Sequence, residues 1–130
     1  MAGNFQSASG LKRVRGLGSA KSGTRHWWLQ RVTAASNLLL LIWFVTSLLL
    51  LPGRDHSSMI AWISQPLVAV PLLLLIFSTF WHARLGVQVM IEDYVHAEGL
   101  KLLAFIALNF FILGAGAIAA FSVLAIAFGA

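Results

Sequence analysis

The chain contains no cysteine among its 130 residues, and it has few charged side chains of either sign. Without a thiol, this chain cannot form a disulfide, bind zinc through thiolates or hold an iron–sulfur cluster through its own side chains. Charged residues make up 10% and hydrophobic residues 59% of the chain, whereas a soluble domain is usually about 45–50% apolar. The composition therefore excludes an ordinary soluble domain and indicates an integral membrane protein.

Acidic side chains are scarcer than basic ones, with four Asp and Glu against nine Lys and Arg. None of the acids lies inside a long apolar stretch; they are Asp55, Glu92, Asp93 and Glu98. A coupled transporter relays ions or protons through polar groups within the membrane, and this sequence offers no carboxylate there. A transport subunit is thus disfavoured and is kept as an alternative only.

Three apolar stretches are each long enough to cross a membrane. They run over residues 27–51, 61–90 and 100–128. A helix needs about 20 apolar residues to cross a hydrocarbon core of about 30 Å. We therefore predict an all-α membrane protein with three transmembrane helices, in which residues 25–130 form the membrane domain. Pro66 and Pro71 should bend the second helix or delay its start, because proline lacks a backbone donor.

The N-terminal tail, residues 1–24, is rich in glycine, serine and basic residues and contains no acid. Such a run can contact nucleic acid, but beside a membrane span it is typical of a topology signal that contacts lipid headgroups, so we expect no nucleic-acid partner. The positive-inside rule places the tail in the cytoplasm and predicts a multi-pass protein of a bacterial inner membrane. Mitochondrial transit peptides share this composition, so the mitochondrial inner membrane is the alternative.

One histidine, His82, lies deep in the second apolar stretch. A titratable side chain at that depth usually faces protein, a cavity or a cofactor. Gly86 follows about one turn later near the same helix face, which leaves room for a planar macrocycle or, equally, for a neighbouring helix. The sequence has no second histidine at matching depth. A haem held by two histidines would therefore take its other ligand from another protein chain.

Two arginines lie within the predicted spans, and each allows two interpretations. Arg31, about one turn inside the first span, can extend to the lipid headgroups or meet an anionic group of a ligand. Arg84 points away from the face of His82. We expect it to reach the membrane surface or to pair with Glu92 or Asp93.

Tyr94 and its neighbour Asp93 stand at the cytoplasmic edge of the second span. A phenol there can donate to a lipid-soluble molecule with a polar head, or it can simply anchor the helix at the interface. Arg31 belongs to the same leaflet boundary. These three side chains could therefore converge on one small pocket.

The third apolar stretch contains one amide and a block of small residues. Asn109 is expected to hydrogen-bond to a neighbouring helix, since an unpaired amide is costly in the membrane. Small residues such as Gly116 and Ala120, four apart, predict close packing against another helix.

Two segments resemble one known family. Residues 78–96 read S-T-F-W-H-A-R-L-G-V-Q-V-M-I-E-D-Y-V-H, which resembles the histidine-to-Asp-Tyr-Val signature of the succinate dehydrogenase hydrophobic membrane anchor, a membrane component of complex II. His82, Gly86, Asp93 and Tyr94 reproduce its spacing. Residues 26–36 read H-W-W-L-Q-R-V-T-A-A-S and resemble the first span of that family. One departure is Arg84, which stands where an aromatic residue is familiar.

The resemblance implies a non-catalytic subunit of an oxidoreductase complex. Its partners would be a flavoprotein subunit, an iron–sulfur subunit and a second anchor subunit of the cytochrome b type, with which it would form a heterodimeric helical bundle in the bilayer. Electrons from succinate would pass to ubiquinone. The alternatives are the haem b anchor of a fumarate reductase and a haem-free structural or transport subunit.

The resemblance also implies roles for individual residues. His82 matches the axial ligand to the iron of a haem b that is shared with the partner anchor, and Gly86 matches the small residue that packs against the haem. Arg31 and His26 match basic residues near the haem propionates. The quinone site would include two adjacent residues, Tyr94, which would hydrogen-bond a ubiquinone carbonyl, and Asp93.

Overall fold

Three long helices and one short one make up the part of the chain that the computed structural model describes, residues 20–129, with side chains from residue 23 onward. The long helices are α2 (Ala20–Leu49), α4 (Pro66–Tyr94) and α5 (Glu98–Phe128), and the short one is α3 (His56–Ile63). Each long helix contains a segment that is long and apolar enough to cross a membrane. These helices confirm the predicted all-α fold, while residues 1–19 of the predicted tail lie outside the described residues.

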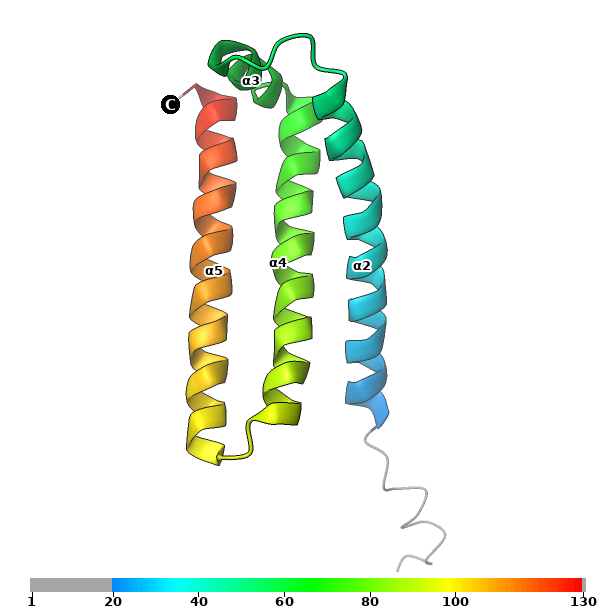
Figure 1. Cartoon of the computed structure of the whole chain (residues 1–130), viewed down its shortest axis with the longest axis vertical. Coiled ribbons are helices and arrows are strands. Elements are labelled where there is room, and N and C mark those ends of the chain that lie inside the picture. Colours follow the sequence, from blue (N-terminus) through cyan, green and yellow to red (C-terminus); the bar gives the residue numbers. More distant parts are fainter. Residues whose placement is uncertain (1–19, 130) are drawn as a thin grey trace, which may run out of the picture.

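Helix α4 is the middle helix of the bundle, with α2 on one side and α5 on the other (Figure 1). Within residues 20–129, α2 and α5 contact α4 but not each other. Most of the buried side chains belong to α4: Val68, Ala69, Leu72, Leu75, Ser78 and Leu85. Large apolar side chains of α2 and α5 are exposed on the single chain. That surface is available to lipid or to other subunits.

The second long helix begins at Pro66, later than the predicted 61–90 span, and it extends to Tyr94. Proline suits this first helical position because its fixed φ fits a helix and its missing N–H needs no partner there. Pro66 thus delays the regular helix as predicted, while Pro71 lies inside it. The third helix begins at Glu98, close to the predicted start.

Residues 56–63 form the separate helix α3, whereas the sequence-based prediction divided them between a loop and the second span. Asp55 caps this helix: its carboxylate accepts hydrogen bonds from the Ser58 amide (3.2 Å), from the Ser58 hydroxyl (2.6 Å) and from the Ser57 hydroxyl. The bonds from Ser57 and then Ser58 hold the pKa of the Asp55 carboxyl well below its usual range. Trp62 anchors α3 through a buried cluster with Val68 and Leu72 of α4.

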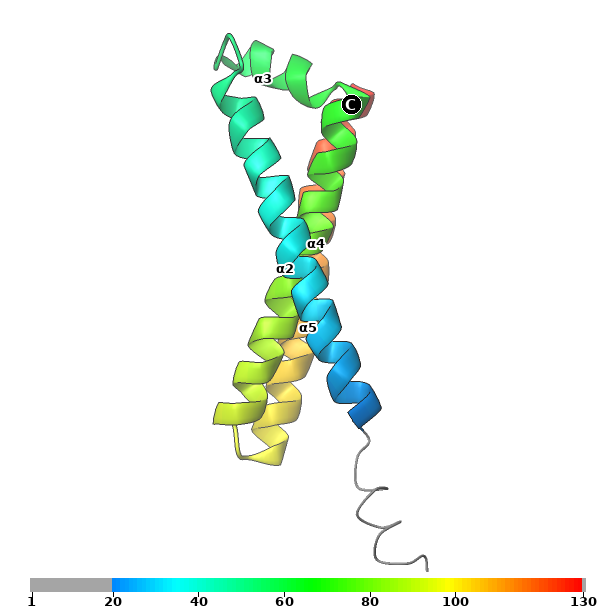
Figure 2. The ribbon, with the colours of Figure 1, turned by 90° about the vertical axis from the view of Figure 1, so that its right-hand side faces the viewer.

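Helices α2 and α4 cross near their middles and diverge toward both ends (Figure 2). The first turns of α2 and the last turns of α4 are nevertheless at the same end of the bundle (Figure 1). The crossing region is where the polar side chains of these two helices meet.

Candidate functional site

Helix α2 crosses α4 (Figure 2). Polar side chains of these two spans contact each other between the crossing helices. The Ser78 hydroxyl donates to the carbonyl of Thr33 (3.3 Å), and the Thr79 hydroxyl donates to the side-chain oxygen of Asn37 (3.4 Å). His82 lies one turn after Ser78 and contacts Thr33. Of these residues, only His82 was predicted from the sequence to belong to a site. The signal that could have found the others is the spacing of polar residues four apart within apolar spans, which places them on one helix face.

Nδ1 of His82 lies 3.0 Å from the hydroxyl oxygen of Thr33. The same hydroxyl lies 2.7 Å from the carbonyl oxygen of Leu29 in the preceding turn of α2. His82 itself is half-buried. Within residues 23–129, Nδ1 is the ring nitrogen that takes part in a hydrogen bond. The other ring nitrogen, Nε2, is therefore available to a ligand from outside this chain.

His82 and Arg31 line the same pocket, which has a volume of about 290 Å³. Trp27 lines it as well, and the Arg31 guanidinium lies over the Trp27 ring, 5.3 Å from its centroid. This contact holds a cation near the histidine, because the face of an indole attracts a guanidinium. The structure thus brings together a nitrogen that can bind a metal and a cation that can pair with a carboxylate.

No group of three or more His, Asp or Glu side chains that could hold a metal ion forms among the described residues. A metal bound at His82 would therefore need its other ligands from a macrocycle or from another chain. Beside Gly86, an added Cβ would meet no atom within 4 Å. The helix face that follows His82 is thus open within this chain. One available histidine nitrogen beside an open helix face fits a haem, whose macrocycle provides the other ligands, better than a metal ion bound by this chain alone.

His26 lies in a different pocket, of about 580 Å³, which is also lined by Arg25, Arg84 and Gln88. Its Nε2 is buried and has no hydrogen-bond partner among the described residues. His26 and Arg31 are five residues apart, which turns them about 140° from each other on a helix. The structure consequently separates two residues for which the family resemblance implied the same role.

Arg84 connects α4 to α5. Its Nε donates to the side-chain oxygen of Asn109 (2.7 Å), and its guanidinium lies 5.3 Å from the centroid of the Trp81 ring. The expectation that Arg84 would reach the membrane surface or pair with an acid of the inner loop was wrong, because an acceptor on α5 is within its reach. The same bond confirms that Asn109 hydrogen-bonds to a neighbouring helix.

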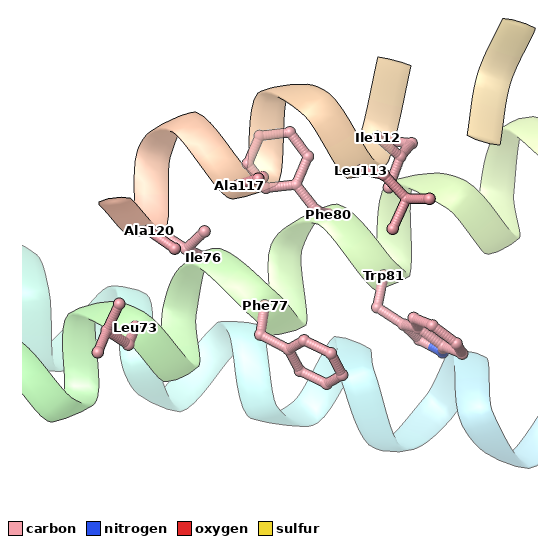
Figure 3. Close-up of a pocket in the computed structure, with 10 residues that line it drawn as sticks. Leu73, Ile76, Phe77, Phe80, Trp81, Ile112, Leu113, Ala117 and Ala120 are labelled. Atoms are coloured by element: carbon pink, nitrogen blue, oxygen red, sulfur yellow. The ribbon is translucent and has the colours of Figure 1, made fainter. Parts of the chain in front are cut away.

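Away from this bond and from the end of the bundle, where Lys101 contacts Glu92, α4 and α5 meet through apolar side chains. A Cβ added to Gly116 would lie 3.6 Å from Cγ of Phe80, so the lack of a side chain there lets α5 approach α4 closely, as predicted. An apolar pocket of about 290 Å³ lies between the helices, with Phe80 directed toward α5 (Figure 3). Phe77 and Trp81 stack on each other with ring centroids 5.8 Å apart. These side chains pack the helices together, and Trp81 also contacts the Arg84 guanidinium.

Asp93 and Tyr94 lie exposed in the last turn of α4, and the side chain of Tyr94 is 78% exposed. The helix stops there because Val95 has an extended backbone. Figure 2 shows that the first turns of α2 diverge from the last turns of α4. Asp93 and Tyr94 therefore lie at the end of α4, whereas Arg31 lines the pocket of His82. Within this chain the three side chains do not form the single pocket that the sequence suggested.

Glu92 takes part in two contacts near the connection to α5. Its carboxylate accepts a hydrogen bond from Gln88 (2.9 Å), and its backbone carbonyl accepts one from the Lys101 ammonium (3.3 Å). The first contact lies within α4, and the second ties the end of α4 to the start of α5. The acids of this connection are thereby held at one end of the bundle, on the same side as Tyr94.

Comparison with known proteins places the chain among membrane subunits. The model of the family described as succinate dehydrogenase/fumarate reductase transmembrane subunit matches residues 6–116. The chain is 36% identical over 101 residues to the succinate dehydrogenase hydrophobic membrane anchor subunit of Rickettsia bellii, covering 78% of this chain and 81% of that protein. It is 35% identical over 92 residues to that of Rickettsia conorii (70% and 73%) and 30% identical over 83 residues to that of Paracoccus denitrificans (64% of each).

Proposed function

The chain belongs to the succinate dehydrogenase/fumarate reductase transmembrane subunit family, and we propose that it anchors a flavoprotein and an iron–sulfur subunit to the membrane together with a second anchor subunit. Two features support this role. The three long helices use most of the described chain, and the outer helices expose large apolar side chains that a second set of helices can cover. Without cysteine the chain cannot hold an iron–sulfur cluster through thiolates, so in the proposed complex any such cluster would belong to another subunit.

We propose that His82 provides one of two axial ligands to a haem b shared with the second anchor subunit. The observation that carries this proposal is the pocket that joins His82 and Arg31. Nε2 of His82 would bind the iron, and the Arg31 guanidinium would pair with a propionate carboxylate. The open space beside Gly86 would accept the edge of the macrocycle. Haem, when bound, exchanges single electrons.

His26 is proposed as a second contact to the propionates. Its buried Nε2 has no partner among the described residues, and Arg25 and Arg84 line the same pocket. A carboxylate that entered this pocket would meet two guanidinium groups and a ring nitrogen. Because His26 lines a different pocket from Arg31, the two basic residues would contact different carboxylates of the haem.

The end of α4 is proposed as part of the site that reduces ubiquinone. The exposed Tyr94 hydroxyl would donate a hydrogen bond to one quinone carbonyl and stabilise the negative charge that develops on that oxygen during reduction. Asp93 would lie beside Tyr94 as the acidic residue of the pocket. Both side chains are exposed in the single chain, so the partner subunits would provide the remaining walls of the pocket.

We propose that the N-terminus and the connection between α4 and α5 both face the cytoplasm. Helix α2 begins at the end of the bundle where α4 ends (Figure 1). The start of α2 and the connection between α4 and α5 would therefore face the same side of the membrane. The basic N-terminal region favours the cytoplasmic side of a bacterial inner membrane. Tyr94 would then lie on the side from which the soluble subunits deliver electrons.

The haem assignment is tested by replacing His82 with Ala and recording reduced-minus-oxidised spectra of the purified complex. We expect the b-type signal to be lost, because alanine offers no ligand to the iron. His56→Ala is a matched control, since His56 lies exposed at the other end of the bundle. A full b-type signal from an assembled His82→Ala complex would refute the assignment.

The quinone assignment is tested with Tyr94→Phe, which removes the hydroxyl and keeps the ring. We expect ubiquinone reduction to fall by roughly 100–1,000-fold, the range for loss of one hydrogen bond to a developing oxyanion, while succinate oxidation with a soluble artificial acceptor is retained. The artificial-acceptor assay controls for assembly of the complex. Normal quinone turnover in the variant would exclude Tyr94 from the site.

A further inference from the structure

The contact between Thr33 and His82 gives a residue of the first span a role at the proposed iron ligand. We propose that Thr33 is a positioning residue: its hydroxyl fixes the proton of His82 on Nδ1 and orients the imidazole so that Nε2 is presented to the iron. This inference rests on the proposed haem ligation by His82. It concerns a hydrogen bond that this chain makes with its own residues.

The position of the protons follows from the distances around the Thr33 hydroxyl. This group has one proton and two carbonyl neighbours on α2, the oxygens of Leu29 at 2.7 Å and Gln30 at 3.2 Å, besides Nδ1 of His82 at 3.0 Å. O–H···O bonds are typically about 2.7–2.8 Å long and N–H···O bonds about 2.9–3.0 Å. The hydroxyl therefore donates to Leu29, and its oxygen accepts the proton that Nδ1 carries.

A neutral imidazole holds one proton, so a proton on Nδ1 leaves a lone pair on Nε2. Nε2 is then ready to bind a metal without first losing a proton. With the opposite tautomer, a proton would stand on Nε2 and block the bond to iron. The hydroxyl of Thr33 thus selects the form of His82 that can act as a ligand.

A second hydrogen bond holds Thr33 at the right place. Ser78, which is only 5% exposed, donates to the Thr33 carbonyl (3.3 Å) and stands one turn from His82 on α4. Thr33 therefore contacts α4 through both its backbone and its side chain. Because a β-branched side chain in a helix has few χ1 rotamers, the direction of the hydroxyl is restricted as well.

Hydrogen bonds from the far nitrogen of a metal-binding histidine orient the ring and raise its basicity, and their loss typically costs about 10–100-fold in metal affinity or activity. A more basic ligand favours the oxidised iron. Loss of the Thr33 hydroxyl should therefore weaken haem binding and raise the haem midpoint potential. A role in helix packing alone would change neither the potential nor the electronic structure of the haem.

The experiment uses the assembled complex with Thr33→Val, which keeps the shape of the side chain and removes the hydroxyl, and Thr33→Ser, which keeps the hydroxyl. Thr79→Val is the matched control, because it removes another hydroxyl at the same helix crossing that contacts Asn37 and not His82. Haem per complex, the electron paramagnetic resonance g-values of the oxidised haem and its midpoint potential are measured. We expect roughly 10–100-fold weaker haem binding, shifted g-values and a higher potential for Thr33→Val, and wild-type values for the other two.

Unchanged g-values and midpoint potential in Thr33→Val would overturn the inference. Should that variant fail to assemble, Thr33→Ala removes the hydroxyl without adding bulk, and the same shifts are expected. Failure of both to assemble, with Thr33→Ser assembled, would assign the hydroxyl to helix packing and also overturn the inference. The His82→Ala variant distinguishes this inference from the proposed function. If His82→Ala retains the b-type signal, haem ligation by His82 is refuted. If His82→Ala loses the signal and Thr33→Val has the properties of the wild type, only the role of Thr33 is refuted.

Discussion

Helix α4 packs against α2 through side-chain hydrogen bonds and against α5 chiefly through apolar contacts. Toward α2, polar groups of Ser78, Thr79 and His82 face polar groups of Thr33 and Asn37. Toward α5, the Phe80 ring of α4 rests over Gly116 of α5. Two polar bonds accompany this contact, from Arg84 to Asn109 and from Lys101 to the Glu92 carbonyl at the end of the bundle. The two interfaces thus hold the same helix with different kinds of interaction.

The difference shows which polar residues serve structure and which are available for chemistry. Lipid is as apolar as a leucine side chain, so helices in a membrane associate through close packing and hydrogen bonds rather than through the hydrophobic effect. The α4–α5 interface meets this need with Gly116 and with the bond between Arg84 and Asn109. At the α2–α4 interface, Thr33 contacts one ring nitrogen of His82 and the other ring nitrogen stays available. Association of the two helices alone does not require an available nitrogen.

The largest effect on stability is expected from removing the acceptor of Arg84. Asn109→Leu should lower the free energy of unfolding by about 1.5–3 kcal/mol, because it leaves a half-buried guanidinium without its hydrogen bond. Denaturation of the purified complex in mixed detergent measures the loss. Ser122→Ala is the control, since within residues 23–129 the Ser122 hydroxyl bonds to the carbonyl of Ile118 in its own helix. Adding Arg84→Met to Asn109→Leu should restore part of the stability, because it removes the unpaired guanidinium. If no stability is recovered, the bond between Arg84 and Asn109 does not stabilise the α4–α5 interface.

A smaller loss is expected from filling the close approach of α4 and α5. Gly116→Leu should cost about 1–3 kcal/mol, because the added atoms would press against Phe80. Gly116→Ala should be nearly neutral, since its Cβ would make an ordinary contact at 3.6 Å. Gly114→Leu is the matched control, because a Cβ there would meet nothing within 4 Å. Equal losses from the leucines at 114 and 116 would contradict an interface built on Gly116.

Thr79→Val tests the peripheral bond of the α2–α4 interface. The bond to Asn37 is long, 3.4 Å, and hydrogen bonds between membrane helices average about 0.6 kcal/mol, so we expect a loss of that order. The same denaturation experiment measures it. If Thr79→Val lost as much stability as Asn109→Leu, the bond between Thr79 and Asn37 would be as strong as the bond between Arg84 and Asn109, contrary to our expectation.

The smallest effect is expected outside both interfaces, at the cap of α3. Hydrogen bonds from Ser57 and Ser58 lower the pKa of Asp55, so its ionised form favours the folded state. This contribution is present at neutral pH and is lost as the pH falls from the ordinary carboxyl value of about 3.9 toward the lower folded pKa. Asp55→Asn should therefore be slightly less stable than the parent at pH 7, with a difference that shrinks below about pH 4. A pH-independent difference between the two melting temperatures would contradict the charged cap.

Some of the site could be predicted from residues alone. His82 was identifiable because one titratable side chain in a long apolar run has few tolerable environments. Asn109 was predictable for the same reason. Arg84 was not, because a long side chain can reach several partners, and only the packing of α5 against α4 decides which acceptor is close. The separate helix α3 was missed because its apolar residues continue into those of α4, and the break depends on the cap at Asp55 and the start at Pro66.

The sequence by itself determined the class of this protein: three runs of apolar residues force three helices, since every backbone group within a membrane must be hydrogen-bonded. It also identified His82 and Arg31 as residues that could carry chemistry, but it did not identify Thr33. Only the tertiary structure decided which of them meet, because contacts between helices depend on crossing angle and rotation as well as on spacing along the chain. That crossing places Arg31 with His82, sends His26 into another pocket and puts the hydroxyl of Thr33 against the imidazole.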